Sequence, residues 1–414
     1  MNAESSQQAQ ERDRNRLARN RTGGPIARRI NASKILALKG DPAPFNDFSS
    51  WAQDCANGKV YFYGGTLPGL ASDGKYTADL FSLDLVSMEW QDLTDMLHFT
   101  NPYDPFSKLL QGEKLPALQH AACAFISLND RNFLMVFGGY DQAKSKRSSS
   151  LIAIDVDRHS WWWVRPEGIP VISRFSPTMV AIKNRLYIFG GLQDDVILKS
   201  YSIIEYADGA WRWVERDRHA CYPDGSELPL WPFALSASAV SLYNGKQILL
   251  TPGRANIGQT IHFSKENVLF FHSENRTFHN IALTVGDFPQ NIWWYQIHVV
   301  NHSKVSGRLF AATSGKKRKR DSDAPQISSS TTPRVIICGW TPYPNTDDLI
   351  PEFWEYLPFP EDKIMCLNVS QKIWDMDQDL QGIASMKGRL FLLGRDKPEV
   401  NLWDIYVEAT DLIK

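Results

Sequence analysis

The chain has 414 residues, of which 43% are hydrophobic and 22% are charged, and its formal net charge is −1. This balance is typical of a folded globular protein, and it excludes a chain that is disordered throughout or uniformly basic. The five cysteines lie far apart and form no CxxC pair, which favours reduced thiols in an intracellular protein over a disulfide framework or a zinc site.

The first segment of the chain is polar and rich in arginine. Residues 1–29 carry seven arginines and almost no large apolar side chain, so we expect a disordered basic arm that contacts nucleic acid at most nonspecifically, through phosphates. The arm lacks the apolar core of a secretory signal, and no apolar run approaches the ~18 residues that a membrane helix needs. The sequence therefore predicts a protein that is neither secreted nor inserted in a membrane.

One sequence unit recurs from residue 30 onward. Its centre is a short apolar run that ends at a glycine, and continuous hydrophobicity of this kind predicts a strand covered on both faces. The glycine permits positive φ or a close approach of two backbones. Three copies end in a doublet, namely Gly64-Gly65, Gly138-Gly139 and Gly190-Gly191, and three weaker copies end at Gly253, Gly339 and Gly394.

The rest of the unit supplies three more strands. A strand of small residues precedes the apolar run, which suits the crowded centre of a radial array. A third strand follows and ends in a polar residue, and an aromatic residue stands six positions later, beyond a tight turn. We expect the polar residue to accept backbone hydrogen bonds in the turn and the aromatic residue to pack between repeats. The pairs are Asp84/Trp90, Asp155/Trp161, Glu205/Trp211, His272/Phe278 and Asn368/Trp374.

Four strands per unit and six units predict an all-β fold, a six-bladed β-propeller that spans residues 30–414. The sixth unit lacks its aromatic strand. We therefore expect segment 30–40 to pair with Leu402–Val407 and close the ring, because this pairing removes two open sheet edges. Two alternatives stay open: segment 30–40 is only an anchored tail, or residues 306–315 belong to a seventh blade.

The combination of an apolar run, a Gly-Gly doublet, an acidic residue, a turn and a tryptophan resembles the kelch repeat. The resemblance extends over residues 50–410 and is strongest in the first three units. It implies a galactose-oxidase-central-domain-like propeller, and members of this family mostly act as protein-interaction platforms, whereas a minority carry an enzyme site. No F-box or BTB module is apparent in the N-terminal arm, so a role in a ubiquitin ligase would need a separate subunit.

A second basic segment lies inside the repeat region. Residues 314–333 are rich in charge, Ser, Thr and Pro, and we expect a disordered insertion. It contains five consecutive cations, Lys316, Lys317, Arg318, Lys319 and Arg320. Such a strip fits the acidic groove of a nuclear import receptor, and the alternative is a solubilising loop or a nonspecific polyanion contact. We therefore predict a protein of the nucleus, the cytoplasm or both.

The sequence contains no motif for phosphate binding or for a nucleophile elbow, and its nine histidines are scattered along the chain. We therefore expect no cofactor and no enzymatic activity. The leading hypothesis is a non-enzymatic scaffold that presents one propeller face to a protein or peptide partner. The alternative is an intracellular enzyme or small-ligand binder that uses the mouth of the central channel.

The candidate partner-binding residues follow from the expected fold. In a propeller, the loops after each closing glycine and the loops that lead into each first strand gather at one face around the channel, and such loops commonly carry function. Arg, Tyr and Trp are the residue types that most often anchor protein contacts. The candidates are His120, Tyr140, Arg174, Arg254, Trp293, Trp340 and Arg395.

Overall fold

The computed structural model describes most of the repeat region. Apart from a 3-10 turn, η1 at Thr94–Met96, every regular element in the described part is a β-strand, which confirms the all-β class. Within that part, no helix is long and apolar enough to cross a membrane. The described residues are 29–35, 38–44, 46, 49–67, 75–103, 113–194, 196–228, 239–242, 245–251, 269–281, 293–300, 334–342, 349–357, 363–369, 380–386, 389–396 and 399–408.

Several sequence predictions fall on residues outside these ranges. They are the basic arm up to residue 28, the insertion 314–333 with its five cations, Arg254 and Trp374. These stay predictions.

Four sheets contain antiparallel meanders in which each of four strands pairs with the next of the four. The first sheet contains β2 (Ser50–Asp54), β3 (Lys59–Tyr63), β4 (Leu80–Asp84) and β5 (Glu89–Asp92). The second contains β8 (Ala122–Leu128), β9 (Arg131–Phe137), β12 (Leu151–Asp155) and β13 (Ser160–Val164), and β6 (His98–Phe99) adds in parallel to β13. The third contains β14 (Thr178–Ile182), β15 (Arg185–Phe189), β18 (Ser200–Ala207) and β19 (Ala210–His219). The fourth contains β20 (Ala239–Leu242), β21 (Gln247–Leu250), β22 (Leu269–His272) and β23 (Thr277–Asn280).

A larger sheet of eight strands is built from both ends of the chain. One half contains β24 (Trp293–Val300), β25 (Arg334–Pro342), β26 (Leu349–Leu357) and β27 (Lys363–Val369). The other half contains β28 (Leu380–Met386), β29 (Arg389–Asp396), β30 (Glu399–Glu408) and the N-terminal strand β1 (Arg29–Lys34). The two halves join where β1 lies between β30 and β27.

The N-terminal strand pairs with the last strand of the chain. Strand β1 is antiparallel to β30, from Arg29 opposite Glu408 to Lys34 opposite Trp403, so the predicted pairing with Leu402–Val407 is observed. The structure adds a parallel pairing of β1 with β27, which the sequence did not indicate. Farther along, Lys39 bridges to Glu89 of β5, so the same segment connects the last sheet to the first.

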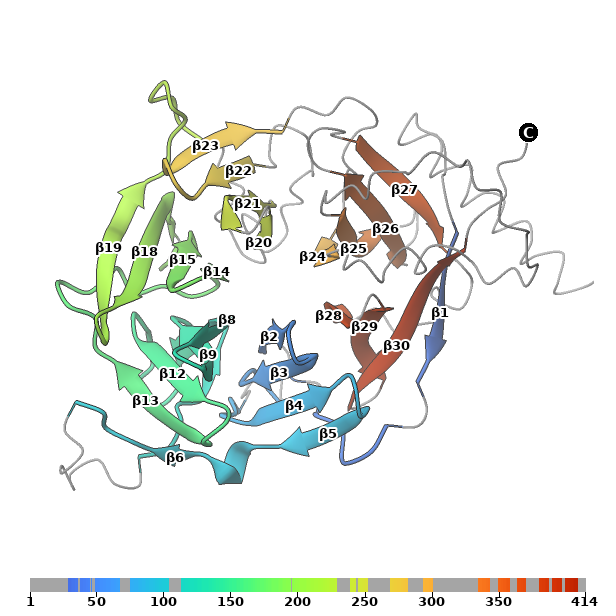
Figure 1. The fold of residues 1–414 in the computed structure, drawn as a ribbon, viewed down its shortest axis with the longest axis horizontal. Helices are drawn as coiled ribbons and strands as arrows, with labels where there is room; N and C mark the ends of the chain where they lie inside the picture. Colours follow the sequence, from blue (N-terminus) through green and yellow to red (C-terminus); the bar gives the residue numbers. More distant parts are fainter. Residues whose placement is uncertain are drawn as a thin grey trace, which may run out of the picture.

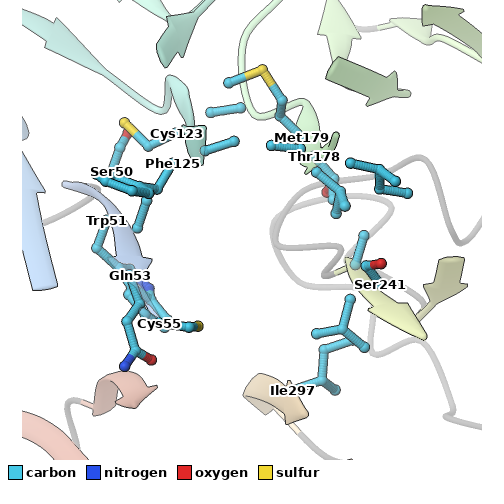
Figure 2. Close-up of a pocket in the computed structure, with 18 of the residues that line it drawn as sticks. Ser50, Trp51, Gln53, Cys55, Cys123, Phe125, Thr178, Met179, Ser241 and Ile297 are labelled. Atoms are coloured by element: carbon cyan, nitrogen blue, oxygen red, sulfur yellow. The ribbon is translucent and has the colours of Figure 1, made fainter. Parts of the chain in front are cut away.

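The sheets are arranged around a common centre, with β2, β8, β14, β20, β24 and β28 innermost (Figure 1). Consecutive innermost strands contact one another from β2 through β8, β14, β20 and β24 to β28. A cavity of about 650 Å³ lies between them and is lined mostly by alanine, serine and β-branched or sulfur-containing side chains (Figure 2). Small side chains therefore occupy the crowded centre, as expected for a radial array of sheets.

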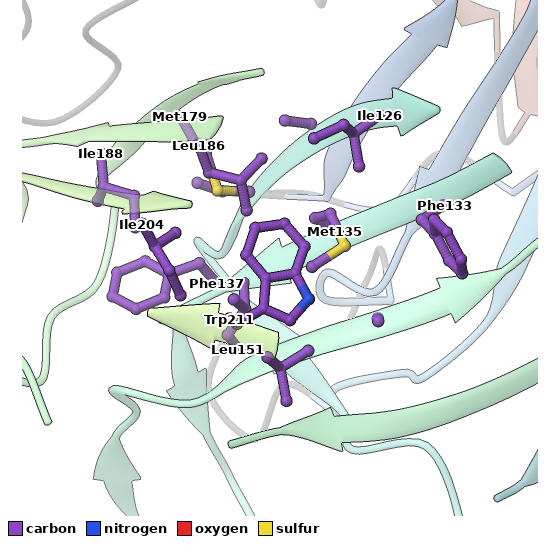
Figure 3. Packing of buried hydrophobic residues seen from close by; sticks show 14 of the residues in the cluster. Ile126, Phe133, Met135, Phe137, Leu151, Met179, Leu186, Ile188, Ile204 and Trp211 are labelled. Atoms are coloured by element: carbon purple, nitrogen blue, oxygen red, sulfur yellow. The ribbon is translucent and has the colours of Figure 1, made fainter. Parts of the chain in front are cut away.

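The core consists of layers between neighbouring sheets rather than one central cluster. Between the second and third sheets, Phe137 of β9 packs with Leu186 and Ile188 of β15, and Trp211 of β19 joins the same cluster (Figure 3). The aromatic residues of the repeat are buried, with exposed fractions of 3% for Trp90, 1% for Trp161, 6% for Trp211 and 1% for Phe278. Each ring contacts residues of its own and adjacent strands, as in the pair Phe99 and Trp161 at 4.9 Å.

The Gly-Gly doublets mark the points where one sheet meets the chain that leads into the next. All six glycines have positive φ, for example 67° at Gly64 and 96° at Gly65. The N–H of Gly65 donates to the carbonyl oxygen of Leu118 at 2.9 Å, and a Cβ atom on Gly64 would lie only 2.4 Å from that oxygen. The doublet is therefore required both by backbone conformation and by the close approach of two chains.

The polar turn residues act in two ways. Asp84 accepts the N–H groups of Val86 and Ser87 at 2.7 and 3.0 Å, and Asp155 holds its turn in the same way. Glu205 has a longer side chain and instead accepts from Arg185 at 2.8 Å, across β15 and β18. The aspartates thus match the expected turn role, whereas the glutamate is an inter-strand ion-pair partner.

Candidate functional site

Connections in an antiparallel meander alternate between the two ends of the sheet. The loops between second and third strands therefore emerge at the same end as the loops that lead from one sheet to the next. We call this end the loop face, and its described residues include 64–67, 75–79, 113–121, 138–150, 165–177, 190–194, 196–200 and 220–228. The opposite end, which carries the short turns at residues 55–58, 129–130, 156–159 and 183–184, is called the turn face.

A small three-stranded sheet rises from the loop face above the second sheet. It consists of β7 (Leu118–Gln119), β10 (Tyr140–Asp141) and β11 (Lys146–Arg147), with Tyr140 paired to both Gln119 and Arg147. The β10–β11 hairpin is thereby fixed to the chain that leads into β8. The predicted residue Tyr140 lies at its centre and is half-buried.

The hairpin also contacts the loop of the first sheet. The rings of Tyr76 and Tyr140 meet edge to face with 6.1 Å between centroids, and the Tyr76 N–H donates to Gln142 Oε1 at 3.0 Å. Gln119 connects the same groups, because it donates to the Tyr76 hydroxyl and its Oε1 accepts from the Thr66 hydroxyl at 2.9 Å. These bonds between sheets limit the movement of the hairpin.

On its other side the hairpin reaches the third sheet through Arg147. The guanidinium carbon of Arg147 lies 5.2 Å from the centroid of the Phe175 ring, a cation–π arrangement. Its NH1 group forms an ion pair with Asp194, which belongs to the hairpin of β16 (Leu192–Gln193) and β17 (Val196–Ile197). The Arg147 side chain is 26% exposed and that of Asp194 is 77% exposed, so this bridge lies at the surface of the loop face.

Lys144 continues the basic character of this hairpin. Its ammonium group lies 5.3 Å from the Trp163 ring centroid and 3.0 Å from the carboxylate of Asp141. Trp163 in turn donates its indole N–H to Glu113 Oε1 at 2.8 Å. Trp163 of β13 thus connects the β10–β11 hairpin to the loop that leads into β8.

Arg174, a predicted partner-binding residue, lies beneath the loop face. Its side chain is 0% exposed and forms an ion pair with Asp217, while Nε donates to the Ile172 carbonyl at 3.1 Å and NH1 to the Gly190 carbonyl at 3.0 Å. Burial lowers the pKa of Arg174 and the neighbouring Asp217 opposes this change. The structure therefore assigns Arg174 to holding the loop 165–177 in place, and its guanidinium is not presented to a partner.

His120 also connects loops of neighbouring sheets. It adopts a positive φ of 54°, its Nδ1 lies 2.9 Å from the Ser176 hydroxyl, and its carbonyl accepts the Ser176 N–H at 2.7 Å. Burial lowers the pKa of His120 to about 4, so the ring is neutral near pH 7. Its ring packs edge to face on Phe175 at 5.7 Å.

The other predicted residues are distributed over the eight-stranded sheet. Trp293 of β24 and Trp340 of β25 are directly opposite each other in the strand register, and Arg395 of β29 is opposite Val400. The structure thus brings His120, Tyr140 and Arg174 together, and separately pairs Trp293 with Trp340. Sequence reasoning missed Lys144, Arg147 and Phe175, although the run of Lys144, Lys146 and Arg147 shortly after a Gly-Gly doublet is a detectable charge signal.

The central cavity is the second candidate site. Cys123, Ser50 and Met179 line it together with Phe125 and Ile297 (Figure 2). Burial raises the pKa of Cys123 to about 12, so its thiol stays protonated near pH 7 and is a poor nucleophile. This cavity is thus better suited to binding than to nucleophilic chemistry.

A polar chain crosses one side of the cavity and connects three innermost strands. Gln53 of β2 donates to the carbonyl of Ser385 in β28 at 2.5 Å and accepts the Ser385 N–H at 3.2 Å. The Ser385 hydroxyl lies 2.8 Å from Nε2 of His298 in β24. Burial lowers the pKa of His298 to about 4, so this histidine is neutral near pH 7 and serves as a hydrogen-bonding partner. The described residues contain no group of three or more His, Cys, Asp or Glu side chains that could hold a metal ion.

Comparisons with known proteins agree with this architecture. Residues 57–306 match a family model described as the KLHDC2/KLHL20/DRC7 Kelch-repeats domain. The chain is also 29% identical over 145 residues to "Rab9 effector protein with kelch motifs" from Xenopus laevis, a match that covers 35% of this chain and 33% of that protein. Because this family model covers more than half of the chain, the chain belongs to the KLHDC2/KLHL20/DRC7 Kelch-repeat family.

Proposed function

We propose that this protein is a non-enzymatic scaffold that binds a protein or peptide partner on its loop face. The observation that carries the proposal is the preorganised surface around the β10–β11 hairpin. There Tyr140 and Arg147 are held by contacts to the loops of the first and third sheets, and Lys144 is held against Trp163 of β13. Fixed side chains lose little conformational freedom on binding, which favours affinity. The similarity to a kelch protein named as an effector supports a role in protein binding.

We further propose six blades for the ring. The first four sheets supply one blade each, β24–β27 supply the fifth, and β28–β30 with β1 supply the sixth. The pairing of β1 with β30 supports this count, because it gives the last unit the outer strand that its own sequence lacks. Residues 306–315, the segment for a seventh blade, lie outside the described ranges.

The function is tested by blocking each face with a matched substitution. Ala143 at the tip of the β10–β11 hairpin and Ala56 in the turn between β2 and β3 are both exposed alanines, on the loop face and the turn face respectively. We expect Ala143→Trp to reduce the recovery of specific partners in affinity purification with quantitative mass spectrometry, and Ala56→Trp to leave it unchanged. Partners that are lost equally with both variants, or with neither, would contradict binding at the loop face.

A small-ligand role for the central cavity is the second candidate. Its volume of about 650 Å³ lies within the range of roughly 300–1,000 Å³ that is typical of ligand pockets. Native mass spectrometry of protein purified under mild conditions tests this role. A stoichiometric adduct that is lost on denaturation would support it, and a spectrum of bare protein from every expression host would count against it.

We also propose that the protein enters the nucleus through the cation strip Lys316 to Arg320, and that it otherwise resides in the cytoplasm. The proposal is supported by the density of positive charge in a segment rich in Ser, Thr and Pro. An import receptor would then be a second protein partner, bound separately from the loop face.

A further inference from the structure

The β10–β11 hairpin carries more positive than negative charge. Residues 140–147, which we call the basic hairpin, contain Lys144, Lys146 and Arg147 against one acid, Asp141. Asp141 is 5% exposed and already paired with Lys144. Lys146 is exposed and forms no ion pair with any described residue. The solvent-facing part of the basic hairpin therefore attracts anionic groups.

Arg147 is the best-positioned cation of the hairpin. Phe175 supports one face of the guanidinium, and the backbone of Arg147 is fixed by pairing with Tyr140. Its Nε atom is buried without a hydrogen-bond partner, so the pair with Asp194 does not satisfy every N–H group of the guanidinium. Because Asp194 is 77% exposed, its carboxylate can leave to solvent at low cost. A carboxylate from another molecule can take its place.

Apolar side chains are exposed on the loops that flank this position. Val196, which follows Asp194 on the β16–β17 hairpin, is 63% exposed. Ile172 is 37% exposed, and its loop is attached to the residue that follows the basic hairpin, because the Arg174 N–H donates to the Ser148 carbonyl at 3.0 Å. Rigid cations beside exposed apolar side chains complement a segment that alternates acidic and apolar residues.

Nucleic acid fits this surface less well. Asp194 lies at its centre, and Tyr76, Tyr140 and Phe175 are already occupied by contacts with one another's loops, so they are not free platforms for bases. A protein segment with a few carboxylates is favoured over a continuous polyanion.

We propose that the loop face over the second and third sheets binds an acidic, partly apolar segment of a partner protein, and that a partner carboxylate replaces Asp194 on Arg147. This inference rests on the proposed scaffold function and specifies the chemistry of the partner. In the unbound protein the Arg147–Asp194 pair holds the two hairpins together. In the complex, Lys144 and Lys146 add electrostatic attraction while Val196 and Ile172 pack on apolar side chains of the segment.

The experiment starts from a random peptide display library selected on the immobilised full-length chain. An enriched peptide is then synthesised together with a counterpart in which Gln and Asn replace Glu and Asp, and binding is measured by fluorescence anisotropy. A single-stranded oligouridine is the nucleic-acid probe. We expect enrichment of acidic peptides, and a loss of affinity of roughly tenfold or more in the uncharged counterpart, since hydrogen bonds to charged groups are among the strong ones.

Two variants test the exchange of carboxylates directly. Arg147→Gln should weaken binding of the acidic peptide about tenfold or more, whereas Asp194→Asn should strengthen it roughly twofold to fivefold, because it removes the competing surface carboxylate. Arg158→Gln is the matched control, since Arg158 lies in the β12–β13 turn of the second sheet, on the turn face, and is 66% exposed. Thermal unfolding of each variant checks that the fold is retained, and Arg147→Lys, which keeps the charge, should bind between wild type and Arg147→Gln.

The outcomes separate this inference from the scaffold function. Enriched peptides without acidic bias, equal affinities of Arg147→Gln and Arg158→Gln, or no gain with Asp194→Asn would overturn the acidic-segment proposal. Tighter binding of oligouridine than of the acidic peptide would also overturn it, in favour of a nucleic-acid surface. In each of these cases, partners that are lost with Ala143→Trp but retained with Ala56→Trp would still support the scaffold function. If no partner is lost specifically with Ala143→Trp, the scaffold function itself is refuted.

Discussion

Replacing Arg174 with methionine should destabilise the protein strongly, because its side chain is fully buried and ion-paired. The substitution keeps most of the side-chain volume but removes the charge that compensates Asp217 and two donors, to the carbonyls of Ile172 and Gly190. Breaking a buried ion pair by removing one member costs about 3–5 kcal/mol. Because the Asp217 side chain is 20% exposed and can still contact water, we expect a value near the lower end, about 3 kcal/mol.

The measurement is the free energy of unfolding in urea for wild type, Arg174→Met, Asp217→Asn and the double variant. Asp217→Asn should also destabilise, because it leaves the fully buried guanidinium without its counter-ion. The double variant should cost less than the sum of the single ones, with a coupling energy of about 1–3 kcal/mol. A cost below about 1 kcal/mol for Arg174→Met, or strict additivity, would refute the assignment of Arg174 to a buried structural pair.

Three further predictions concern a glycine of the repeat, a buried histidine and the location of the protein in the cell. Gly64→Ala should lower the free energy of unfolding more than Gly209→Ala in the same urea assay. Both glycines have positive φ, but only at Gly64 would a Cβ lie 2.4 Å from the Leu118 carbonyl oxygen. Equal losses of stability in the two variants would contradict the close-approach argument. The pKa of His298 is lowered to about 4 from an ordinary 6.5, so the unfolded state binds the proton more tightly. The contribution of His298 to stability is therefore complete above pH 6.5 and falls by roughly 3 kcal/mol toward pH 4. His298→Gln should remove this part of the fall, while the similar contribution of His120, whose pKa is also lowered to about 4, remains. Replacing Lys316 to Arg320 with alanines should move a fluorescently tagged protein out of the nucleus, and an unchanged distribution would refute the import proposal.

Much of the fold could be predicted because its demands are local. Both glycines of each Gly-Gly doublet have positive φ, a conformation that favours glycine at these positions. An aspartate such as Asp84 accepts hydrogen bonds from backbone N–H groups two and three residues away. Such requirements repeat with the unit and are visible in one sequence. The parallel pairing of β1 with β27 has no comparable signal, because it depends on how two distant strands meet at the rim.

The candidate site could be predicted only as a set of loops. The position of Arg174 before a first strand predicts a side chain at the surface. Instead, a bulge between Tyr201 and Ile203 shifts the register of β18 against β19. Asp217, near the end of β19, forms an ion pair with the buried Arg174 guanidinium. The Arg147–Asp194 pair joins residues of two hairpins on different sheets. Its existence depends on the angle and distance between those sheets, which no local pattern encodes.

The closure of the ring bears directly on the loop face, because a rigid ring fixes the distances between its loops. At the outer rim, the segment from β1 to Lys39 pairs with β30, β27 and β5 in turn. At the inner rim, Gln53, Ser385 and His298 connect β2, β28 and β24. With both rims connected, a partner carboxylate that replaces Asp194 changes one surface ion pair without opening the ring. The binding energy is then available for the contact itself, since little of it is needed to order the loops.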